Sequence, residues 1–245
     1  MITTKKQLCD IPAAGRFMYA GIDWVKLDTD PKTGNVLALS VGPIFNRAFD
    51  DDNCNDWRAS SLRRELNGPF LDALVAEGAD REAFTEFESD LTADDGMKDY
   101  GTATDRLALL TDDLYRRYRA IIPPVDSWCW NLTPYSCHPD YRAGARGVDS
   151  SGALYRNYAY SGSDGVRPLC NFKSGILVSV IDEEATAEEA RQDTIGEAAD
   201  AILQTLDEFD PEIRGDAMAA ALARMFAEVI DAQKSRTDDT GAAEG

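Results

Sequence analysis

The chain changes character after Ile181, and this change limits the possible folds more than any other feature of the sequence. Before it, short apolar runs alternate with clusters of Gly, Pro, Ser and Asp, a pattern typical of strands and loops. After it, Thr186–Glu189 fits a helix-capping box, and Asp210–Pro211 fits the start of a second amphipathic helix. We therefore expect a C-terminal helical hairpin at residues 182–234 and a disordered tail at 235–245.

Strands are expected near the start of residues 1–181. Gly21–Asp28 alternates apolar and polar residues, a turn follows at Pro31–Gly34, and Asn35–Ser40 is apolar again. This arrangement predicts a β-hairpin. Arg106–Leu110 predicts a further short strand, whereas the weakly patterned, acidic stretch Arg81–Asp99 predicts a loop with one helical turn.

Two helices are expected in the same region. Apolar residues recur at helical spacing through Trp57–Leu74, and Asn67–Pro69 should end or kink that helix. Thr111 is placed to cap a second helix that ends near Tyr118. Small antiparallel sheets, two helices and long loops together predict a fold of the α+β class.

The charge and the apolar runs exclude several kinds of partner. The net charge is −19, and residues 182–245 contribute −13 of it through 18 acidic and 5 basic side chains. Such a field repels phosphate backbones, so we expect no nucleic-acid partner. No apolar run is long enough for membrane insertion, and Met1–Asp10 does not fit a signal peptide. A cytoplasmic and a virion-associated location both remain open.

Residues suited to catalysis or metal binding are few. The five cysteines are scattered without a Cys-x-x-Cys pair, and His138 is the only histidine. Cys137, His138 and Asp140 form the one combination that could support a metal- or cysteine-dependent enzyme, but neighbouring side chains on extended backbone point to opposite faces. We therefore expect no enzymatic activity and no metal or other cofactor.

The stretch Trp128–Pro168 has an unusual composition. It holds five of the nine tyrosines, interleaved with Arg, Asp, Ser and Gly, and contains no Lys, Glu, Gln or Met. Tyrosine and arginine give large contact areas and directional hydrogen bonds at low entropic cost, as in antibody paratopes. A Gly/Tyr-rich β region with half-buried tyrosines would have the same composition, so both interpretations remain open at this point.

Several motifs resemble a large bacterial and phage domain family of uncharacterised function. Trp57–Asn67 is similar to that family's Trp-x-x-Ser-x-Leu-Arg-x-x-Leu-Asn segment. The resemblance covers about residues 15–181, and the motifs that carry it occur in the family's order: Gly21–Ser40, Trp57–Asn67, Asp105–Leu110 with Tyr115, Trp130–Pro134, Val148–Gly152 and Gly165–Cys170.

The resemblance implies a fold and a function. The family is similar to the C-type-lectin fold in its formylglycine-generating-enzyme-like branch. Members of that fold include hypervariable proteins diversified by diversity-generating retroelements, typically receptor-binding proteins of phages or surface proteins of bacteria. The enzymes of this branch bind copper through paired cysteines, and no such pair is placed in this sequence, so their oxidase activity is not implied.

The resemblance also implies a set of variable positions. Retroelement mutagenesis of adenines in Asn codons cannot produce Lys, Glu, Gln, Met or Trp, and Trp128–Pro168 lacks the first four of these. The predicted ligand-binding residues, all reachable from an Asn codon, are Tyr135, Ser136, Cys137, His138, Asp140, Tyr141, Arg142, Tyr155, Arg156, Asn157, Tyr158, Tyr160, Ser161, Ser163 and Asp164.

The sequence thus predicts a C-type-lectin-like α+β domain at residues 1–181 that carries a C-terminal helical hairpin and binds a protein or glycan on a cell surface. Trp128 and Trp130 are expected as core anchors, Gly165 as a position of positive φ or of close backbone approach, and Arg167 as a donor to loop carbonyls. Two rival functions remain: an enzyme related to formylglycine-generating enzymes, and a structural phage or mobile-element protein assembled through its C-terminal helices.

Overall fold

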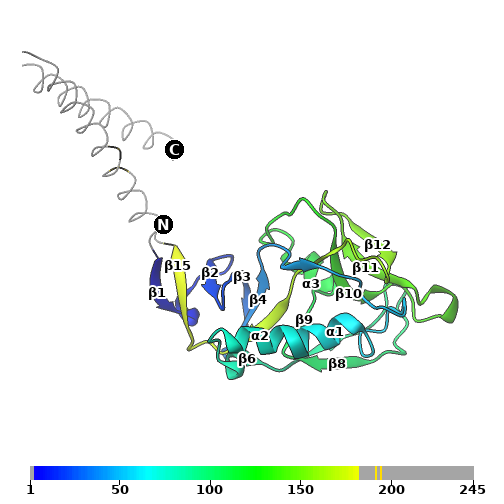
Figure 1. Cartoon of the computed structure of the whole chain (residues 1–245), viewed down its shortest axis with the longest axis horizontal. Helices are drawn as coiled ribbons and strands as arrows, with labels where there is room; N and C mark the ends of the chain where they lie inside the picture. Colours follow the sequence, from blue (N-terminus) through cyan, green and yellow to red (C-terminus); the bar gives the residue numbers. More distant parts are fainter. Residues whose placement is uncertain (1–2, 182–190, 192–193, 195–245) are drawn as a thin grey trace, which may run out of the picture. The chain divides into compact units, whose positions relative to one another are not determined.

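The computed structural model describes residues 3–181 together with Arg191 and Thr194 (Figure 1). The chain divides into two compact units, Met1–Asp182 and Glu183–Gly245, and residues 3–181 all belong to the first unit. The expected helical hairpin at 182–234 and the expected tail at 235–245 lie outside the described residues, apart from those two single positions.

Strands dominate the first unit, and the expected α+β, C-type-lectin-like architecture is wrong. Of the described residues, 35% lie in strands and 19% in helices, and the two main sheets are curled half-barrels. The error has a local cause. Phe84–Asp90 lies within Arg81–Asp99, the stretch predicted to be a loop with one helical turn, but it folds into two short strands, and the first of them pairs with a strand far away in the sequence.

The larger sheet has the order β1-β15-β2-β3-β4-β14-β6, and β9 also pairs with β14. All of its pairings are antiparallel. The expected hairpin is confirmed as β3 and β4. The strands are β1 (Thr3–Gln7), β2 (Arg16–Tyr19), β3 (Ile22–Thr29), β4 (Val36–Ser40), β6 (Phe84–Thr85), β9 (Leu107–Ala108), β14 (Leu169–Phe172) and β15 (Leu177–Ile181).

The second sheet has five strands in the order β12-β11-β10-β13-β5, so β12 is a terminal strand. A separate two-stranded sheet pairs β7 with β8. The strands of these two sheets are β5 (Phe45–Asn46), β7 (Phe87–Asp90), β8 (Thr102–Asp105), β10 (Cys129–Pro134), β11 (Gly144–Val148), β12 (Leu154–Tyr158) and β13 (Gly165–Val166).

The longest helix begins after Ser60, whose hydroxyl accepts hydrogen bonds from the N–H groups of Leu62 and Arg63. It runs through α1 (Ser61–Glu65), the wider turn η2 (Leu66–Phe70) and α2 (Leu71–Ala76), and it bends at Gly68 as expected. The expected helix α3 (Asp112–Tyr118) is confirmed, with Thr111 as its N-cap. Three short 3₁₀ turns are η1 (Leu8–Asp10), η3 (Arg81–Ala83) and η4 (Pro139–Tyr141).

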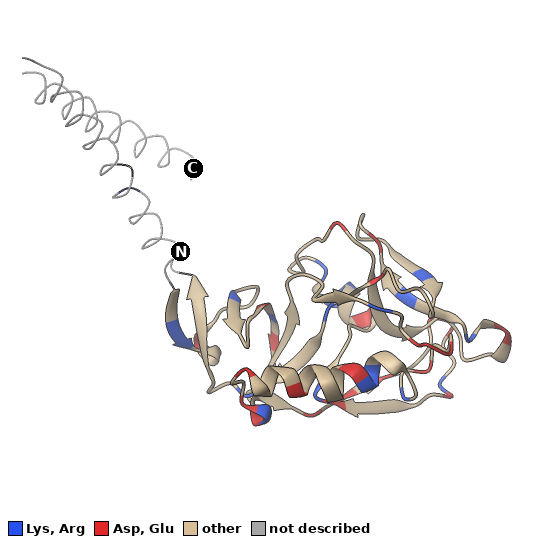
Figure 2. Cartoon of the chain, viewed as in Figure 1, with Lys and Arg blue, Asp and Glu red and all other residues tan. Residues whose placement is uncertain are grey.

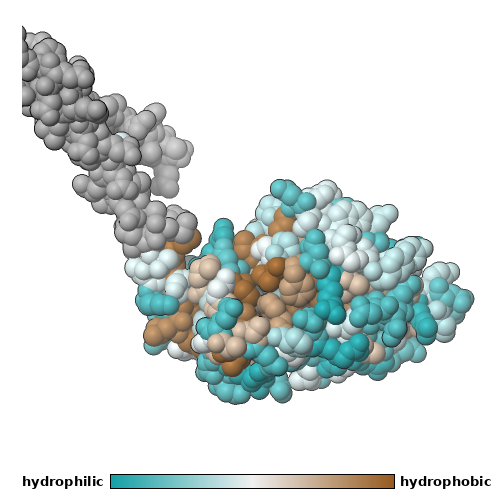
Figure 3. Space-filling model, in the orientation of Figure 1, coloured by the Kyte–Doolittle hydropathy of each residue, from teal (hydrophilic) through white to brown (hydrophobic). Residues whose placement is uncertain are grey.

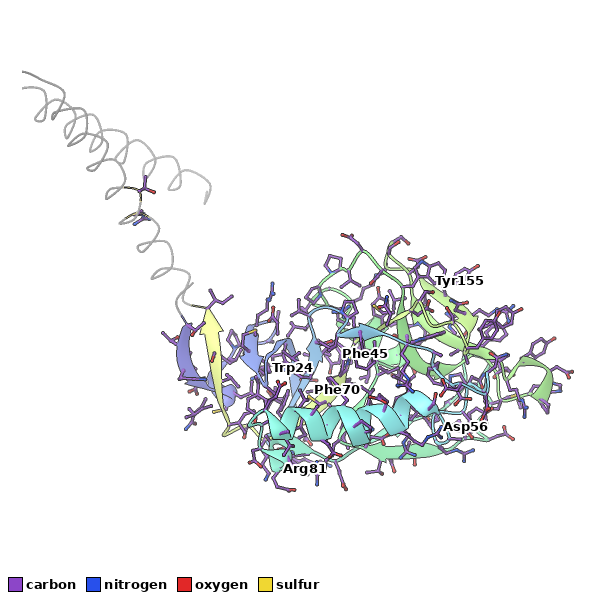
Figure 4. The ribbon with its side chains drawn as sticks, in the orientation of Figure 1. Trp24, Phe45, Asp56, Phe70, Arg81 and Tyr155 are labelled. Carbon is purple, nitrogen blue, oxygen red and sulfur yellow. The ribbon has the colours of Figure 1, made fainter. Side chains whose placement is uncertain are left out.

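An aromatic cluster fills the core beneath the larger sheet. The ring of Phe172 lies 5.1 Å from those of Trp24 and Phe84 and within 6 Å of Phe17 and Tyr19. Figure 4 shows Trp24 among the strands of this sheet. Edge-on ring contacts of this kind are favourable beyond the area that they bury. The cluster therefore anchors β2, β3, β6 and β14 to one another.

The chain passes from the second sheet to the larger one at Arg167, and the expected scaffold role of this residue is confirmed. Its guanidinium is buried and donates hydrogen bonds to the carbonyl oxygens of Ser40, Val41 and Pro123 at 2.9–3.3 Å. Gly165 is needed because a Cβ there would lie 2.8 Å from the Cβ of Pro43. Trp130 is 1% exposed, but Trp128 is 38% exposed, so the prediction of a core position for Trp128 is wrong.

Candidate functional site

The 135–164 segment follows a strand that is buried along its whole length. Every residue of β10 is buried, and this strand pairs with β11 on one side and β13 on the other. The chain then leaves the core, because Tyr135 is half-buried and η4 is exposed. It returns through β11 and β12, which pair from Gly144–Tyr158 to Val148–Leu154. The segment thus contains a regular antiparallel hairpin, β11–β12.

A loop before the longest helix is hydrogen-bonded to the backbone of this segment through Asn55. Asn55 is fully buried, and its amide nitrogen donates to the carbonyl oxygens of Ser136 and Gly144 at 3.0 and 2.7 Å. The hydroxyl of Tyr100 donates to the Asn55 side-chain oxygen at 3.0 Å. With donors and acceptor all satisfied, Asn55 fixes the start of β11. Sequence reasoning missed this residue because its two carbonyl partners are backbone atoms 81 and 89 positions away.

Four tyrosines of the segment face solvent. Tyr141, Tyr155, Tyr158 and Tyr160 are each between 53% and 59% exposed. Figure 4 shows Tyr155 at the outer surface beside the second sheet. Large aromatic side chains are normally mostly buried, so four exposed rings in one segment mark this surface as unusual.

The structure brings one subset of the predicted residues together through ring contacts. The guanidinium of Arg156 lies over the ring of Tyr135 at 4.3 Å, Tyr135 contacts Tyr141, and Tyr141 contacts His138. The rings of Tyr158 and Tyr160 stack 5.6 Å apart. These contacts order side chains that would otherwise move freely, which lowers the entropic cost of binding.

Tyr155 lies on the face of β12 opposite to Arg156 and Tyr158. Successive side chains of a strand alternate between faces, so Tyr155 and Asn157 point away from Arg156 and Tyr158. Tyr155 packs edge-on against Trp128, with ring centroids 5.1 Å apart. Sequence reasoning assigned Trp128 to the core because it is a large aromatic residue, but the buried strand β10 begins only at Cys129, so Trp128 lies outside it.

Two of the predicted residues are buried and serve the scaffold. Ser136 donates a hydrogen bond to the sulfur of Met97. Asp164 accepts hydrogen bonds from Asn157, Ser161 and Ser163 at 3.0–3.3 Å. Burial raises the pKa of Asp164 above its ordinary value, and these hydrogen bonds oppose that rise only in part. Asn157, Ser161, Ser163 and Asp164 thus form a small network that closes the turn after β12.

Exposure of the remaining predicted residues is mixed. His138, Asp140, Arg142 and Arg156 are exposed, and Cys137 is half-buried. The Cys137 thiol contacts the Met97 carbonyl oxygen, whereas His138 Nδ1 accepts a hydrogen bond from the Asp140 N–H at 3.2 Å. Burial raises the pKa of the Cys137 thiol. A raised pKa keeps this thiol protonated, which weakens it as a nucleophile.

A buried ionic network lies beneath β11. Arg146 Nε donates to the carboxylate of Asp112 at 2.9 Å, and Asn131 donates to its other oxygen at 2.8 Å. Because Asp112 begins α3 and Asn131 belongs to β10, the network ties this helix to the second sheet. We assign it a positioning role, since both carboxylate oxygens are satisfied within the fold.

Comparisons with family models, curated proteins and solved structures found no match. Among the described residues, no group of three His, Cys, Asp or Glu side chains is placed to hold a metal ion. In the same part of the chain, no helix combines the length and the apolar character that crossing a membrane requires.

Proposed function

We propose that this protein is a non-enzymatic ligand-binding protein that recognises a protein or glycan on a cell surface through its 135–164 segment. The observation that carries the proposal is the exposure of Tyr141, Tyr155, Tyr158 and Tyr160 on and beside a regular β-hairpin. Rigid aromatic side chains presented by an ordered backbone are typical of specific recognition surfaces. The net charge of −19 favours such partners over nucleic acid.

The motif resemblance supports the same proposal by a separate route. Variable proteins require a scaffold that survives many side-chain changes, and the exposed residues of the segment make few contacts with the core. Arg142 and Tyr155 are examples, since the structure gives Arg142 no side-chain hydrogen bond within the described residues and Tyr155 only its ring contact with Trp128. A retroelement could therefore change such positions without unfolding the domain.

A binding screen tests the proposal directly. The wild-type chain would be applied to arrays of cell-surface glycans and of bacterial surface proteins, beside a variant in which Tyr155, Arg156 and Tyr158 are all replaced by Ala. We expect a discrete set of wild-type ligands whose binding falls at least about tenfold in the variant. Leu177→Ala, an exposed apolar change on the larger sheet, is the matched control and should leave binding unchanged. Equal binding by the triple variant would disprove the proposal.

A further inference from the structure

The outer edge of β12 carries backbone groups that are available for hydrogen bonding. The Asp149 N–H bonds to the Ala153 carbonyl, and the Ala159 N–H bonds to the Ala143 carbonyl. By the alternation of antiparallel ladders, Tyr155 and Asn157 bond to β11, whereas Leu154 and Arg156 direct their N–H and C=O groups away from it. Within residues 3–181, no backbone or side-chain group forms a hydrogen bond with these outward groups.

The edge has little protection beyond the charge of Arg156. Natural edge strands often carry charged side chains, especially Lys, or carry Pro, or are covered, because an open edge pairs readily with another chain. β12 has the sequence Leu-Tyr-Arg-Asn-Tyr, without Lys or Pro. It lies at the outer limit of its sheet beside β11 (Figure 1). The backbone groups of Tyr158 are already used within the chain. Its N–H donates to the Asn157 side-chain oxygen, and its carbonyl oxygen accepts from the Ser161 N–H.

A shallow depression of about 480 Å³ lies against β12 and the start of β11. Residues of both faces of β12, among them Tyr155, Arg156 and Tyr158, line one side of it, and Asp140 and Tyr141 line another. Figure 3 shows mainly neutral and hydrophilic residues over the second sheet, whereas apolar residues gather over β1, β15 and β4. The depression is therefore suited to a polar, extended ligand rather than to an apolar helix.

Arg156 lines the depression, and Arg142 lies in the chain between Tyr141 and Ala143, which also line it. Most arginines of the described residues pair with a carboxylate, as Arg63 does with Asp105. No carboxylate of the described residues pairs with Arg142 or Arg156, and the Arg156 guanidinium lies over the ring of Tyr135. Figure 2 shows the one basic residue of β12, Arg156, in blue on the second sheet. Residues 182–245 contribute −13 of the net charge of −19, and the two exposed guanidinium groups make this edge locally positive, so it favours a short anionic segment although the chain as a whole repels polyanions.

We infer that the ligand of this surface is a protein partner whose extended acidic segment adds to the second sheet as a strand beside β12. The inference rests on the proposed function and names the class of ligand. Backbone groups of the partner would bond to Leu154 and Arg156, which provides affinity. Carboxylates of the partner would bind Arg142 and Arg156, which fixes register and excludes basic segments. A glycan would not use the peptide-like alternation of donors and acceptors along this edge.

Selection of displayed peptides tests the inference. Random peptides of about twelve residues on phage, long enough to span the edge strand, would be selected on the immobilised full-length chain, and the enriched peptides synthesised. We expect enriched peptides that are acidic and contain no central Pro. Binding should weaken by about tenfold or more with Arg156→Ser, and less with Arg142→Ser. Arg64→Ser is the matched control, because Arg64 is an exposed arginine on α1 whose guanidinium donates to a carbonyl oxygen rather than to a carboxylate.

N-methylation of the selected peptides gives the sharper readout. Methylating one backbone nitrogen at a time should weaken binding at every second residue only, since alternate N–H groups of an added strand face β12. If methylation weakened binding at every position of the peptide, or at none, the inference would be overturned. The absence of enriched acidic peptides would also overturn it. Binding only to sialylated glycans, sensitive to the Tyr155, Arg156 and Tyr158 triple variant, would overturn it while leaving the proposed function intact.

Discussion

Two groups of aromatic residues make similar ring contacts in opposite surroundings. In the larger sheet, Phe172 and Trp24 are fully buried and their rings lie 5.1 Å apart. In the second sheet, Tyr158 and Tyr160 stack at 5.6 Å while each remains 59% exposed. The first group is mostly Phe and Trp, and the second consists of Tyr, whose hydroxyl can remain in water.

The difference shows that ring contacts alone do not identify a core. The buried group packs in the core beneath the larger sheet, where four of its five rings are at most 1% exposed, so each ring excludes water from its neighbours. The exposed group lies at the terminal strand β12 and on the turn after it, where no further strand of the described part covers the rings. Stability should therefore depend on the first group, and recognition on the second. Four sets of substitutions test this separation, in order of decreasing effect.

Phe172→Ala should have the largest effect. It removes a fully buried ring that contacts four other aromatic side chains. We expect a loss of about 3–5 kcal/mol in the free energy of unfolding, since core Phe-to-Ala changes combine lost burial with a cavity. Urea denaturation followed by tryptophan fluorescence would measure it. Phe172→Leu, which keeps most of the volume, should lose much less. A loss under about 1 kcal/mol for Phe172→Ala would contradict the core role of this cluster.

Arg167→Ala should have the next largest effect. Arg167 is 7% exposed, and without it the carbonyl oxygens of Ser40, Val41 and Pro123 lose a donor at the junction of the two main sheets. We expect a loss of about 1–3 kcal/mol in the free energy of unfolding, measured by the same urea denaturation. Arg167→Lys should recover only part of it, because one ammonium group cannot reach three carbonyls with the geometry of a guanidinium. Full recovery by Lys would show that charge matters here rather than hydrogen-bond geometry.

Replacing Tyr155, Arg156 and Tyr158 together by Ala should change stability little. Exposed side chains typically contribute within about 0.5 kcal/mol each, so the melting temperature should stay close to that of the wild type. Differential scanning calorimetry of this variant beside Trp130→Ala makes the contrast direct, because Trp130 is buried and donates to the Arg47 carbonyl at 2.8 Å. If both variants melted equally early, the exposed tyrosines would be packing residues and the separation of roles would fail.

Local features of the fold could be predicted from the sequence. The β3–β4 hairpin follows from alternation around a Pro-Lys-Thr-Gly turn, and α3 follows from the cap at Thr111. The donor role of Arg167 also follows, since a buried arginine in loop sequence must satisfy its guanidinium. These features depend on contacts within a few residues, or on the chemistry of a single side chain.

The arrangement of the sheets could not be predicted in this way. Strands β5, β6, β9 and β13 have two residues each, too few to show a period, and they are defined by partners distant in sequence. β10 is buried on both faces and shows no alternation either. Tyr155 and Tyr158 lie on β12, whose terminal position only the sheet order reveals, whereas Tyr141 lies in η4 and Tyr160 in the turn after β12.

The smallest effect on stability is expected for Asp164, the buried carboxylate of the 135–164 segment. Burial raises its pKa in the folded state above the value of the unfolded chain. The folded protein therefore holds this proton to higher pH, and the stability that the protonated form provides is lost as the pH rises through the folded-state pKa. At neutral pH, the ionised carboxylate should weaken the fold slightly, although Asn157, Ser161 and Ser163 donate to it.

Asp164→Asn separates the cost of burying the ionised carboxylate from the contribution of its hydrogen bonds. The amide oxygen can still accept from the same donors, but it carries no charge. We expect the variant to melt at the same temperature as the wild type or slightly higher at about pH 7, and its advantage to shrink at about pH 3.5, where the wild-type carboxyl is largely protonated in both states. Thermal melts of both proteins across this range measure the difference. A variant less stable at neutral pH than the wild type would mean that the charge itself stabilises the turn after β12. In that case the hydrogen bonds to the ionised Asp164 would stabilise the fold by more than the desolvation of its charge destabilises it, and Asp164 would be a structural residue of the scaffold.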